Sequence, residues 1–183
     1  SIENELKQRS NLDLKPQIIA VTKTFSLDDV KPLIDYGHLH YGENKIQEAQ
    51  KKWTDVKNNI ENLKLHMIGK LQTNKVKFAI PLFDYIHSLD NIKLAEKISS
   101  EQKKFGKKLK IFIQVNIGEE NQKSGISKDL VSNFYKVCIN DLDLDIIGLM
   151  CIPPAKEDMS HYFSAMNKLN KLIGLNELSM GMS

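Results

Sequence analysis

A lysine stands where the first apolar run of the sequence ends. The run 18–21 leads within two residues to Lys23, and Ser26 then offers an N-cap for a helix with Asp28 and Asp29 in its first turn. A lysine at the end of a strand can simply lead the chain into solvent. A partly desolvated amine is also a nucleophile toward carbonyl groups, with which it forms a Schiff base. Lys23 is therefore the first candidate for chemistry.

Further polar residues and glycines follow the other apolar runs. Asn44 opens a helical pattern, so it either caps that helix or donates to a ligand. His66 and His87 lie within or at the end of strand patterns, which is more typical of hydrogen-bonded core histidines than of ligands. The segment 179–183, Ser-Met-Gly-Met-Ser, offers a glycine and two serines where barrel enzymes often bind a phosphate.

Metal and disulfide chemistry are not indicated. The sequence has no HxH or HExxH spacing and its acidic residues are scattered, so we expect no metal site. Cys138 and Cys151 have no CxxC spacing, which predicts two buried thiols in a reducing compartment.

The elements that would position these residues alternate along the chain. The apolar runs predict seven strands, at Gln17–Val21, His38–Tyr41, Lys64–Ile68, Tyr85–Ser88, Lys110–Asn116, Leu144–Leu149 and Glu177–Met180. Helical spacing predicts four buried faces between them, made by Leu27, Val30, Leu33 and Ile34; by Ile92, Leu94, Ala95 and Ile98; by Leu130, Phe134, Val137 and Cys138; and by Tyr162, Phe163, Met166, Leu169 and Ile173. Ile2, Leu6 and Arg9 suggest a short leading helix.

Strands that alternate with helices pair in parallel through right-handed crossovers. Either an open doubly wound sheet or a closed (β/α)8 barrel meets this pattern. The first turn, 22–25, has no glycine, whereas a nucleotide-binding open sheet usually has a glycine-rich one. We therefore predict an α/β fold of the (β/α)8 TIM-barrel type. Only seven strands are found, so the last helix and strand of the barrel are expected to be missing.

Length and composition suit one soluble domain over residues 1–183. Hydrophobic residues make up 41% and charged residues 27% of the 183 residues. The apolar runs are too short to span a bilayer and no secretory signal opens the chain, so no membrane association is predicted. The net charge of +3 does not call for nucleic acid. The basic run 103–110 is interpreted as a solvated connection.

Seven stretches of the chain, in order, resemble the YggS/PROSC family of pyridoxal 5′-phosphate (PLP) homeostasis proteins, relatives of the alanine racemase N-terminal barrel. They are AVTKTF (20–25), YGENKIQEAQKK (41–52), LHMIGKLQTNK (65–75), IHSLDNIKLAEKI (86–98), IFIQVNIGEENQKSGI (111–126), IIGLMCIPP (146–154) and LSMGMS (178–183). They cover nearly the whole chain.

The resemblance implies a PLP site and its residues. It implies that Lys23 carries PLP as a Schiff base and that Ser183 begins the phosphate site. Asn44 and Ile68 resemble members of the cofactor pocket, and Met150 lies where the family lines that pocket. Family members continue past residue 183 with further phosphate donors and an arginine-bearing strand, so the chain is expected to be incomplete at its C-terminus.

The predicted function is that of a cofactor carrier in the cytoplasm, acting as a monomer. PLP enzymes add acid/base groups on the faces of the ring, and Tyr41 and Cys151 are better explained by packing. The chain would hold PLP and transfer it to PLP-requiring apoenzymes, without catalytic residues of its own. Lys123, in the loop after the fifth strand, is a hypothetical second acceptor during transfer.

Three alternatives remain. The first is a small PLP-dependent amino-acid racemase or decarboxylase. The second is a Schiff-base aldolase that uses Lys23 without a cofactor. A nucleic-acid-binding module rests only on the basic run 103–110.

Overall fold

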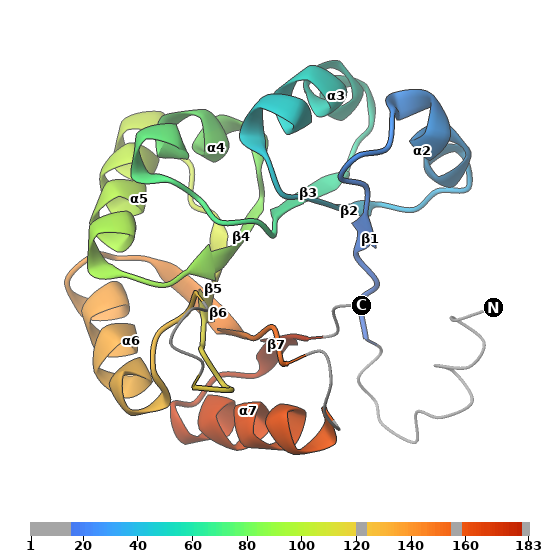
Figure 1. Cartoon of the computed structure of the whole chain (residues 1–183). Coiled ribbons are helices and arrows are strands. Elements are labelled where there is room, and N and C mark those ends of the chain that lie inside the picture. The colour runs from blue at the N-terminus through green and yellow to red at the C-terminus, as the bar shows by residue number, and fades with distance from the viewer. Residues whose placement is uncertain (1–15, 120–123, 155–158, 181–183) are drawn as a thin grey trace.

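The computed structural model describes residues 16–119, 124–154 and 159–180, which form one curved parallel sheet with helices around its outside (Figure 1). The strands are β1 (Ala20–Val21), β2 (His40–Glu43), β3 (Lys64–Met67), β4 (Tyr85–Leu89), β5 (Lys110–Gln114), β6 (Asp145–Met150) and β7 (Glu177–Ser179). Each strand pairs in parallel with the next in the chain, so the order is β1 to β7. This is the sequential order of a (β/α)8 barrel, here with seven described strands, and the predicted fold class is confirmed.

The helices return the chain from the end of one strand to the start of the next. They are α2 (Leu27–Asp35), α3 (Ile46–Asn59), α4 (Val76–Leu82), α5 (Ile92–Phe105), α6 (Val131–Asn140) and α7 (Ser160–Leu172), with single 3-10 turns at η1 (Thr73–Lys75) and η2 (Lys128–Leu130). All lie on the convex side of the sheet (Figure 1). No described helix is long and apolar enough to cross a membrane.

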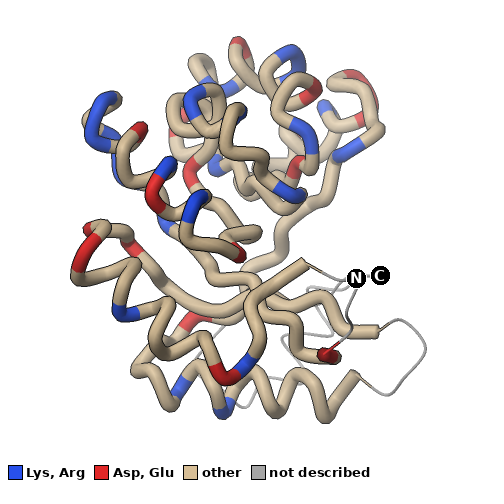
Figure 2. The backbone as a smooth tube through the Cα atoms, turned by 60° about the vertical axis from the view of Figure 1, so that its left-hand side comes forward, with Lys and Arg blue, Asp and Glu red and all other residues tan. Residues whose placement is uncertain are grey.

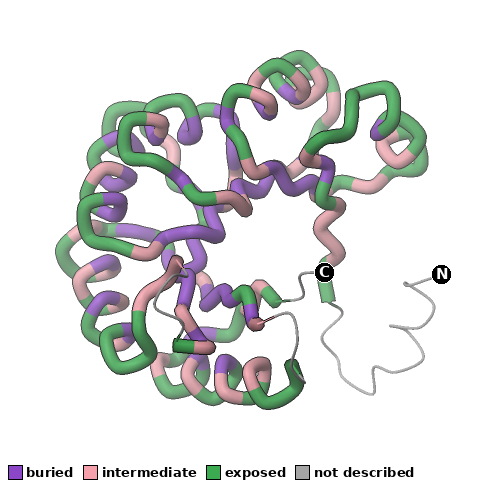
Figure 3. Tube along the Cα trace, in the orientation of Figure 1, coloured by how far each residue is buried: buried purple, intermediate pink, exposed green. Residues whose placement is uncertain are grey.

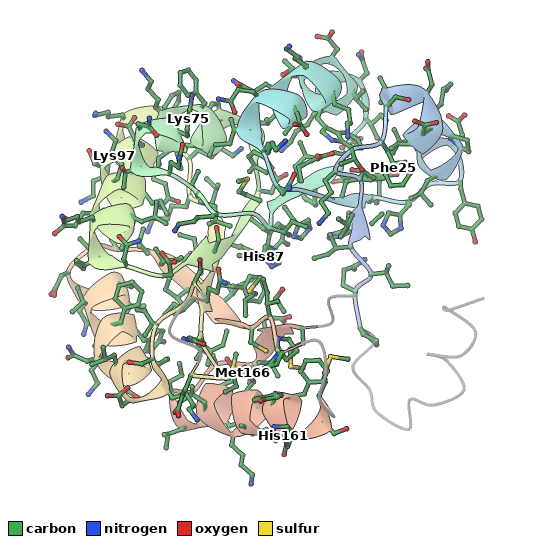
Figure 4. All side chains as sticks on the ribbon, in the orientation of Figure 1. Phe25, Lys75, His87, Lys97, His161 and Met166 are labelled. Carbon is green, nitrogen blue, oxygen red and sulfur yellow. The ribbon has the colours of Figure 1, made fainter. Side chains whose placement is uncertain are left out.

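The main core lies between the sheet and the helices. Figure 3 shows the buried residues concentrated in the strands and on the helix faces turned toward them. Trp53 of α3 is fully buried and packs against Tyr41 of β2, with ring centroids 4.6 Å apart. Met166 of α7 is likewise buried against the sheet (Figure 4). This layer follows from the apolar residues that alternate along each strand and recur every three to four positions along each helix.

The concave side of the sheet is lined differently. Successive strand residues point to opposite faces, and the residues opposite the core are His40, His66, His87 and Phe112 rather than the branched aliphatic residues usual inside such barrels. The His87 and Phe112 rings stack with centroids 4.5 Å apart, and the His66 and Tyr85 rings with centroids 4.2 Å apart. The interior is therefore aromatic and polar.

The sequence pattern misplaces the first two strands. The first covers Ala20–Val21 rather than Gln17–Val21, because β1 pairs with β2 only at these two residues. The second covers His40–Glu43 rather than His38–Tyr41, a shift of two residues. Its start is delayed because Gly37 adopts a left-handed φ of 91° and the backbone N–H of His38 still donates to Leu33 of α2.

The predicted helical faces correspond to α2, α5, α6 and α7, with three wrong members. Leu27 is 37% exposed, Ile92 is 41% exposed and Leu130 is 55% exposed. Leu27 and Ile92 open α2 and α5, and Leu130 lies in the 3-10 turn η2 before α6, so none of them reaches the buried face. Helices α3 and α4 lie between predicted strands but have no predicted face. The expected leading helix around Ile2, Leu6 and Arg9 lies outside the described residues.

The expected burial of the two cysteines is confirmed, and the basic run 103–110 is partly paired. Cys138 and Cys151 are buried free thiols, and burial raises their pKa values to about 12 and about 11. Lysines of the basic run 103–110 are engaged at the surface: Lys107 donates to the carbonyl oxygen of Phe83 at 2.8 Å, and Lys108 pairs with Asp143 at 2.7 Å. Positive and negative residues are interspersed over the outer helices (Figure 2).

Candidate functional site

Lys23 follows β1 directly and lies in a tight turn. The backbone N–H of Phe25 donates to the carbonyl oxygen of Thr22 at 3.2 Å, which closes a four-residue turn with Lys23 in second place. Thr24, in third place, has a φ of 72°, in the left-handed region that β-branched residues seldom adopt. Backbone strain of this kind is concentrated at functional sites. The turn fixes the Lys23 backbone at the carboxyl end of an edge strand.

Helix α2 begins directly after this turn and anchors its far side. The hydroxyl of Ser26 accepts a hydrogen bond from the backbone N–H of Asp29 at 3.3 Å, and the Asp29 carboxylate accepts one from the Ser26 backbone N–H at 2.9 Å. This reciprocal capping box confirms Ser26 as the predicted N-cap. The hydrogen bonds from Ser26, that of its side chain first, lower the pKa of the Asp29 carboxyl.

The buried carboxylate of Glu43 holds the end of β1 in place. Oε1 of Glu43 accepts hydrogen bonds from the Thr22 hydroxyl at 2.7 Å, from Lys52 Nζ at 2.8 Å and from Trp53 Nε1 at 2.9 Å. Lys52 Nζ also donates to the carbonyl oxygen of Thr22 at 2.7 Å. The Glu43 side chain is fully buried and that of Lys52 is 9% exposed. Thr22 is thus fixed at its hydroxyl and its carbonyl, which positions its neighbour Lys23.

The amines of Lys23 and Lys52 differ in their surroundings. Lys52 is committed to a buried ion pair with Glu43. Lys23 is half-buried and forms no hydrogen bond or ion pair with any residue in the described part of the chain. Lys23 is therefore the lysine at this strand end whose amine is available to a ligand.

Hydrogen bonds between strands bring three strand ends to one level. The backbone N–H of Thr22 donates to the carbonyl oxygen of Gly42 at 3.0 Å, and that of Ile68 donates to the carbonyl oxygen of Glu43 at 2.9 Å. Lys23 and Asn44, which directly follow Thr22 and Glu43, therefore lie at the same end of the adjacent strands β1 and β2. Ile68 lies at the same end of the next strand, β3.

A glycine allows the ends of β2 and β3 to approach closely. A Cβ atom on Gly69 would lie 2.3 Å from the carbonyl oxygen of Asn44, closer than any side chain permits. Asn44 is half-buried and lines a groove of about 220 Å³ together with Lys70 and Gln72. Lys23, Asn44 and Ile68 thus occupy consecutive strand ends, as the sequence predicted, and Gly69 permits the close approach of the last two of these ends.

Met150 lies at the carboxyl end of β6, on the other arm of the curved sheet. It is buried, and its register partners are Gln114 of β5 and Ser179 of β7. The structure places it at the same end of the barrel as Lys23 but not on a neighbouring strand. The predicted phosphate residue Ser183 and the loop residue Lys123 lie outside the described residues.

Three histidines cross the inside of the sheet in one line. His40 Nδ1 lies 3.0 Å from His66 Nε2, and His66 Nδ1 lies 2.9 Å from His87 Nε2. His87 Nδ1 in turn lies 2.8 Å from the hydroxyl oxygen of Ser179. This row of hydrogen-bonded side chains links β2, β3 and β4 to β7, the edge of the described sheet opposite β1. Figure 4 shows His87 on the inner side of the sheet. His66 and His87 are hydrogen-bonded core residues, as the sequence predicted.

Burial keeps the inner histidines uncharged. His66 is 3% exposed and His87 is 1% exposed. Burial, reinforced by the neighbouring His87 and His40, lowers the pKa of His66 to about 2. Burial lowers the pKa of His87 to about 3. The pKa of His40 is also lowered, first by burial and then by His38 and Lys64.

Two residues considered as possible acid/base groups have other roles. The Tyr41 hydroxyl donates to the carbonyl oxygen of His38 at 2.8 Å, and burial raises its pKa to about 12. Cys151 is buried and its pKa is raised. Among the described residues, no group of three or more His, Cys, Asp and Glu side chains is arranged to hold a metal ion.

Comparison with known proteins adds independent information. Residues 3–182 match the family model of the alanine racemase N-terminal domain. The chain is 32% identical over 176 residues to the pyridoxal phosphate homeostasis protein of Aquifex aeolicus, covering 91% of this chain and 76% of that protein. It is 29% identical over 193 residues to the protein of the same name from Pasteurella multocida, covering 100% of this chain and 83% of the relative.

Solved structures agree with these matches. PipY of Synechococcus elongatus, in a structure with PLP bound, superposes with a TM-score of 0.84 at 29% identity, covering all of this chain and 90% of PipY. Alanine racemase of Clostridium difficile superposes with a TM-score of 0.69 at 16% identity over 97% of this chain and 47% of the racemase, a likeness of fold alone. The chain belongs to the pyridoxal phosphate homeostasis (YggS/PROSC) family of alanine racemase N-terminal domains.

Proposed function

We propose that this chain binds PLP at the carboxyl ends of its strands, holds it through Lys23 and passes it to PLP-requiring apoenzymes. The observation that carries the proposal is the half-buried Lys23 amine, which no described residue engages, on a backbone fixed by Thr22 and Glu43. The PLP-bound state of PipY and the names of the curated relatives support it.

The residues present fit such a cofactor. Lys23 offers a primary amine for an aldehyde, Asn44 an amide, and Ile68 and Met150 apolar side chains for an aromatic ring. Gly69 lets the backbone of Asn44 lie close to the end of β3. We further propose that Ser183 begins the phosphate site and that residues 1–183 act as one PLP-binding domain.

Each residue has a defined task. The Lys23 amine holds the aldehyde as a Schiff base, and the Glu43–Lys52–Thr22 network keeps that amine at the mouth. PLP, when bound, supplies a reactive aldehyde and an electron-withdrawing ring. Holding the aldehyde reversibly keeps it from other amines until an apoenzyme takes it.

A carrier role is favoured over catalysis. Tyr41 and Cys151, the acid/base candidates that the sequence offered, are engaged in packing. Because the relatives are named for homeostasis, we propose that the chain is not an enzyme and works as a monomer in the cytoplasm, where apoenzymes are supplied.

Reduction with borohydride tests the cofactor site. The protein is incubated with PLP, reduced and mapped by peptide mass spectrometry. We expect a phosphopyridoxyl group on the peptide that contains Lys23 and its loss in Lys23→Ala. Lys70→Ala is the matched control, because Lys70 is an exposed lysine at the neighbouring end of β3 and its removal should leave the adduct in place. An adduct that persists in Lys23→Ala and disappears in Lys70→Ala would contradict the assignment.

A second measurement separates carrier from enzyme. The PLP-loaded protein is incubated with amino acids in deuterated water. We expect no exchange of the α-hydrogen above the rate with free PLP. Exchange well above that rate would identify the chain as a small PLP-dependent racemase or decarboxylase.

A further inference from the structure

The histidine chain inside the sheet has a property that its separate contacts do not reveal. His40, His66, His87 and Ser179 are joined by three hydrogen bonds of 2.8 to 3.0 Å, each between ring nitrogens or between a ring nitrogen and a hydroxyl. Each histidine uses Nδ1 toward the Ser179 end of the chain, and His66 and His87 use Nε2 toward the other end. The three rings are therefore connected in the same sense.

A neutral imidazole carries one N–H and one lone pair. In a hydrogen bond between two such rings, one nitrogen must be protonated and the other not. If neighbouring rings held different tautomers, two N–H groups or two lone pairs would face each other at about 3 Å, and a buried hydrogen bond would be lost. Burial of His66 and His87, with their lowered pKa values, keeps both rings neutral. Two consistent orders remain: all three rings with Nδ1–H, or all three with Nε2–H.

These two orders give Ser179 different chemistry. With Nδ1–H, His87 donates to the Ser179 oxygen, and the hydroxyl proton of Ser179 is free to be donated to a ligand. With Nε2–H, Ser179 donates its own proton to His87 Nδ1 and can only accept from a ligand. Ser179 is half-buried, on the inner side of the sheet at the carboxyl end of β7. This is the end of the barrel at which Lys23 lies.

We propose that the four side chains form a single proton-ordered chain, and that an anionic group bound beside Ser179 selects the order with Nδ1–H on all three histidines. Ser179 is then a hydrogen-bond donor to the anion, and His87, His66 and His40 are positioning residues that act through it. This inference rests on the proposed function, which supplies the anion as the phosphate of PLP.

The change between orders moves one proton at each position. When the anion binds, Ser179 transfers its hydroxyl proton along the hydrogen bond to His87 Nδ1, and the Ser179 oxygen takes up a replacement proton from solvent. His87 passes its Nε2 proton to His66 Nδ1, and His66 passes its Nε2 proton to His40 Nδ1. His40, which is half-exposed, releases its Nε2 proton to water. One proton enters at Ser179 and one leaves at His40, so no net charge is created. No buried imidazole ring has to flip.

Imidazole nitrogen shifts measured by NMR on the histidine-labelled wild-type protein test the ordering directly, because protonated and unprotonated ring nitrogens are well separated. We expect the same tautomer at His40, His66 and His87 in the free protein, and Nδ1–H at all three with PLP bound. Mixed tautomers in either state, or Nε2–H in the bound state, would overturn the proposal. The free protein decides the ordering even if PLP does not bind. Failure to bind would remove the proposed function and the ligand part of this inference together.

Substitution of Ser179 tests its role as donor. Ser179→Ala should weaken PLP binding about tenfold, the effect of one lost hydrogen bond to a charged group. It should also abolish the tautomer change at His40 on adding PLP, while saturating PLP still labels Lys23 after borohydride reduction. Ser179→Thr keeps the hydroxyl and should restore both. Ser164→Ala, at an exposed serine of α7, is the control and should behave as wild type. Unchanged affinity and an unchanged tautomer response in Ser179→Ala would overturn the donor role.

Discussion

The hydroxyl of Thr22 donates to the buried carboxylate of Glu43 at 2.7 Å, so the residue before the candidate lysine is tied to the core of the protein. The same carboxylate oxygen accepts from Lys52 and Trp53. The position of Lys23 thus depends on a carboxylate that is itself fully buried.

Glu43→Gln removes the charge and leaves the Lys52 cation buried without its partner. Loss of one member of a buried pair is strongly destabilising, and we expect the free energy of unfolding to fall by about 3 kcal/mol. Urea unfolding followed by the fluorescence of Trp53 measures this. Glu48→Gln, in the helix α3 that also carries Lys52, is the control, because the Lys45–Glu48 pair is 64% and 43% exposed and its loss should leave the free energy of unfolding nearly unchanged. Equal effects of the two substitutions would refute the role of Glu43.

The buried histidines predict a pH dependence of stability. His66 and His87 have folded pKa values of about 2 and about 3, below the ordinary value of 6.5. Below pH 6.5 the unfolded chain takes up protons at both residues and the folded chain does not. Their contribution to stability is therefore complete above pH 6.5 and is lost as the pH falls toward the folded values.

The size of this effect follows from about 1.4 kcal/mol per pH unit for each histidine. We expect the free energy of unfolding to fall by about 2 to 3 kcal/mol between pH 7.5 and 5.5, measured by urea unfolding at several pH values. The slope should become shallower in His66→Gln and stay unchanged in His161→Gln, which alters an exposed histidine of α7. A stability that does not change over this range would exclude neutral buried histidines.

Gly69→Ala should damage the site through Asn44. A Cβ at 2.3 Å from the Asn44 carbonyl oxygen must push the ends of β2 and β3 apart, and we expect a loss of about 2 kcal/mol of stability together with weaker PLP binding. Gly174→Ala is the control: its φ of 76° is strained for alanine, but no atom lies within 4 Å of the added Cβ. It should lose about 1 kcal/mol of stability without any change in PLP affinity, measured by absorbance titration. Full affinity in Gly69→Ala would dissociate the glycine from the site.

Thr24→Asn should relieve strain in the turn that carries Lys23. Asparagine tolerates a left-handed φ better than a β-branched residue, and Thr24 is exposed, so we expect a gain of about 0.5 kcal/mol in the free energy of unfolding. Thr73→Asn, at an exposed threonine of η1 without a positive φ, should give no such gain. Thermal unfolding compares the wild type with the two variants. If Thr24→Asn alone is destabilising, the side chain of Thr24 has a stabilising role that its backbone conformation does not explain.

Much of the fold can be predicted from local sequence patterns. Alternating apolar runs and helical spacing predict the parallel strand order, and the strand ends follow from it. Lys23, Asn44, Ile68 and Met150 could therefore be placed at one end of a barrel from the sequence alone. Ser26 is recognisable as a cap because its partner Asp29 lies only three residues away. The roles of Asn44, Ile68, Met150 and Ser183 toward a cofactor stay predictions.

The unpredicted features depend on partners that are distant in sequence. The bond between His87 and Ser179 joins residues 92 positions apart, and no local pattern shows that their side chains meet. Glu43 follows the end of the predicted second strand, so the sequence gives no sign that it is buried. It is buried because Lys52 and Trp53 of α3 donate hydrogen bonds to it. Helix α4 is short and contains Pro81, so its spacing gives no clear face. Tertiary contacts decide the first two cases, and the shortness of α4 decides the third.

The shortness of β1 predicts that this edge of the sheet opens more easily than the rest of the molecule. This strand pairs with β2 at only two residues and is an edge of the described sheet. Segments with few cooperative contacts open at a small fraction of the free energy of global unfolding. Backbone amides at 20–22 should then exchange with deuterium long before those of β3 to β5. If Lys23 holds PLP as proposed, opening of this edge strand would release the aldehyde while the rest of the molecule stays folded.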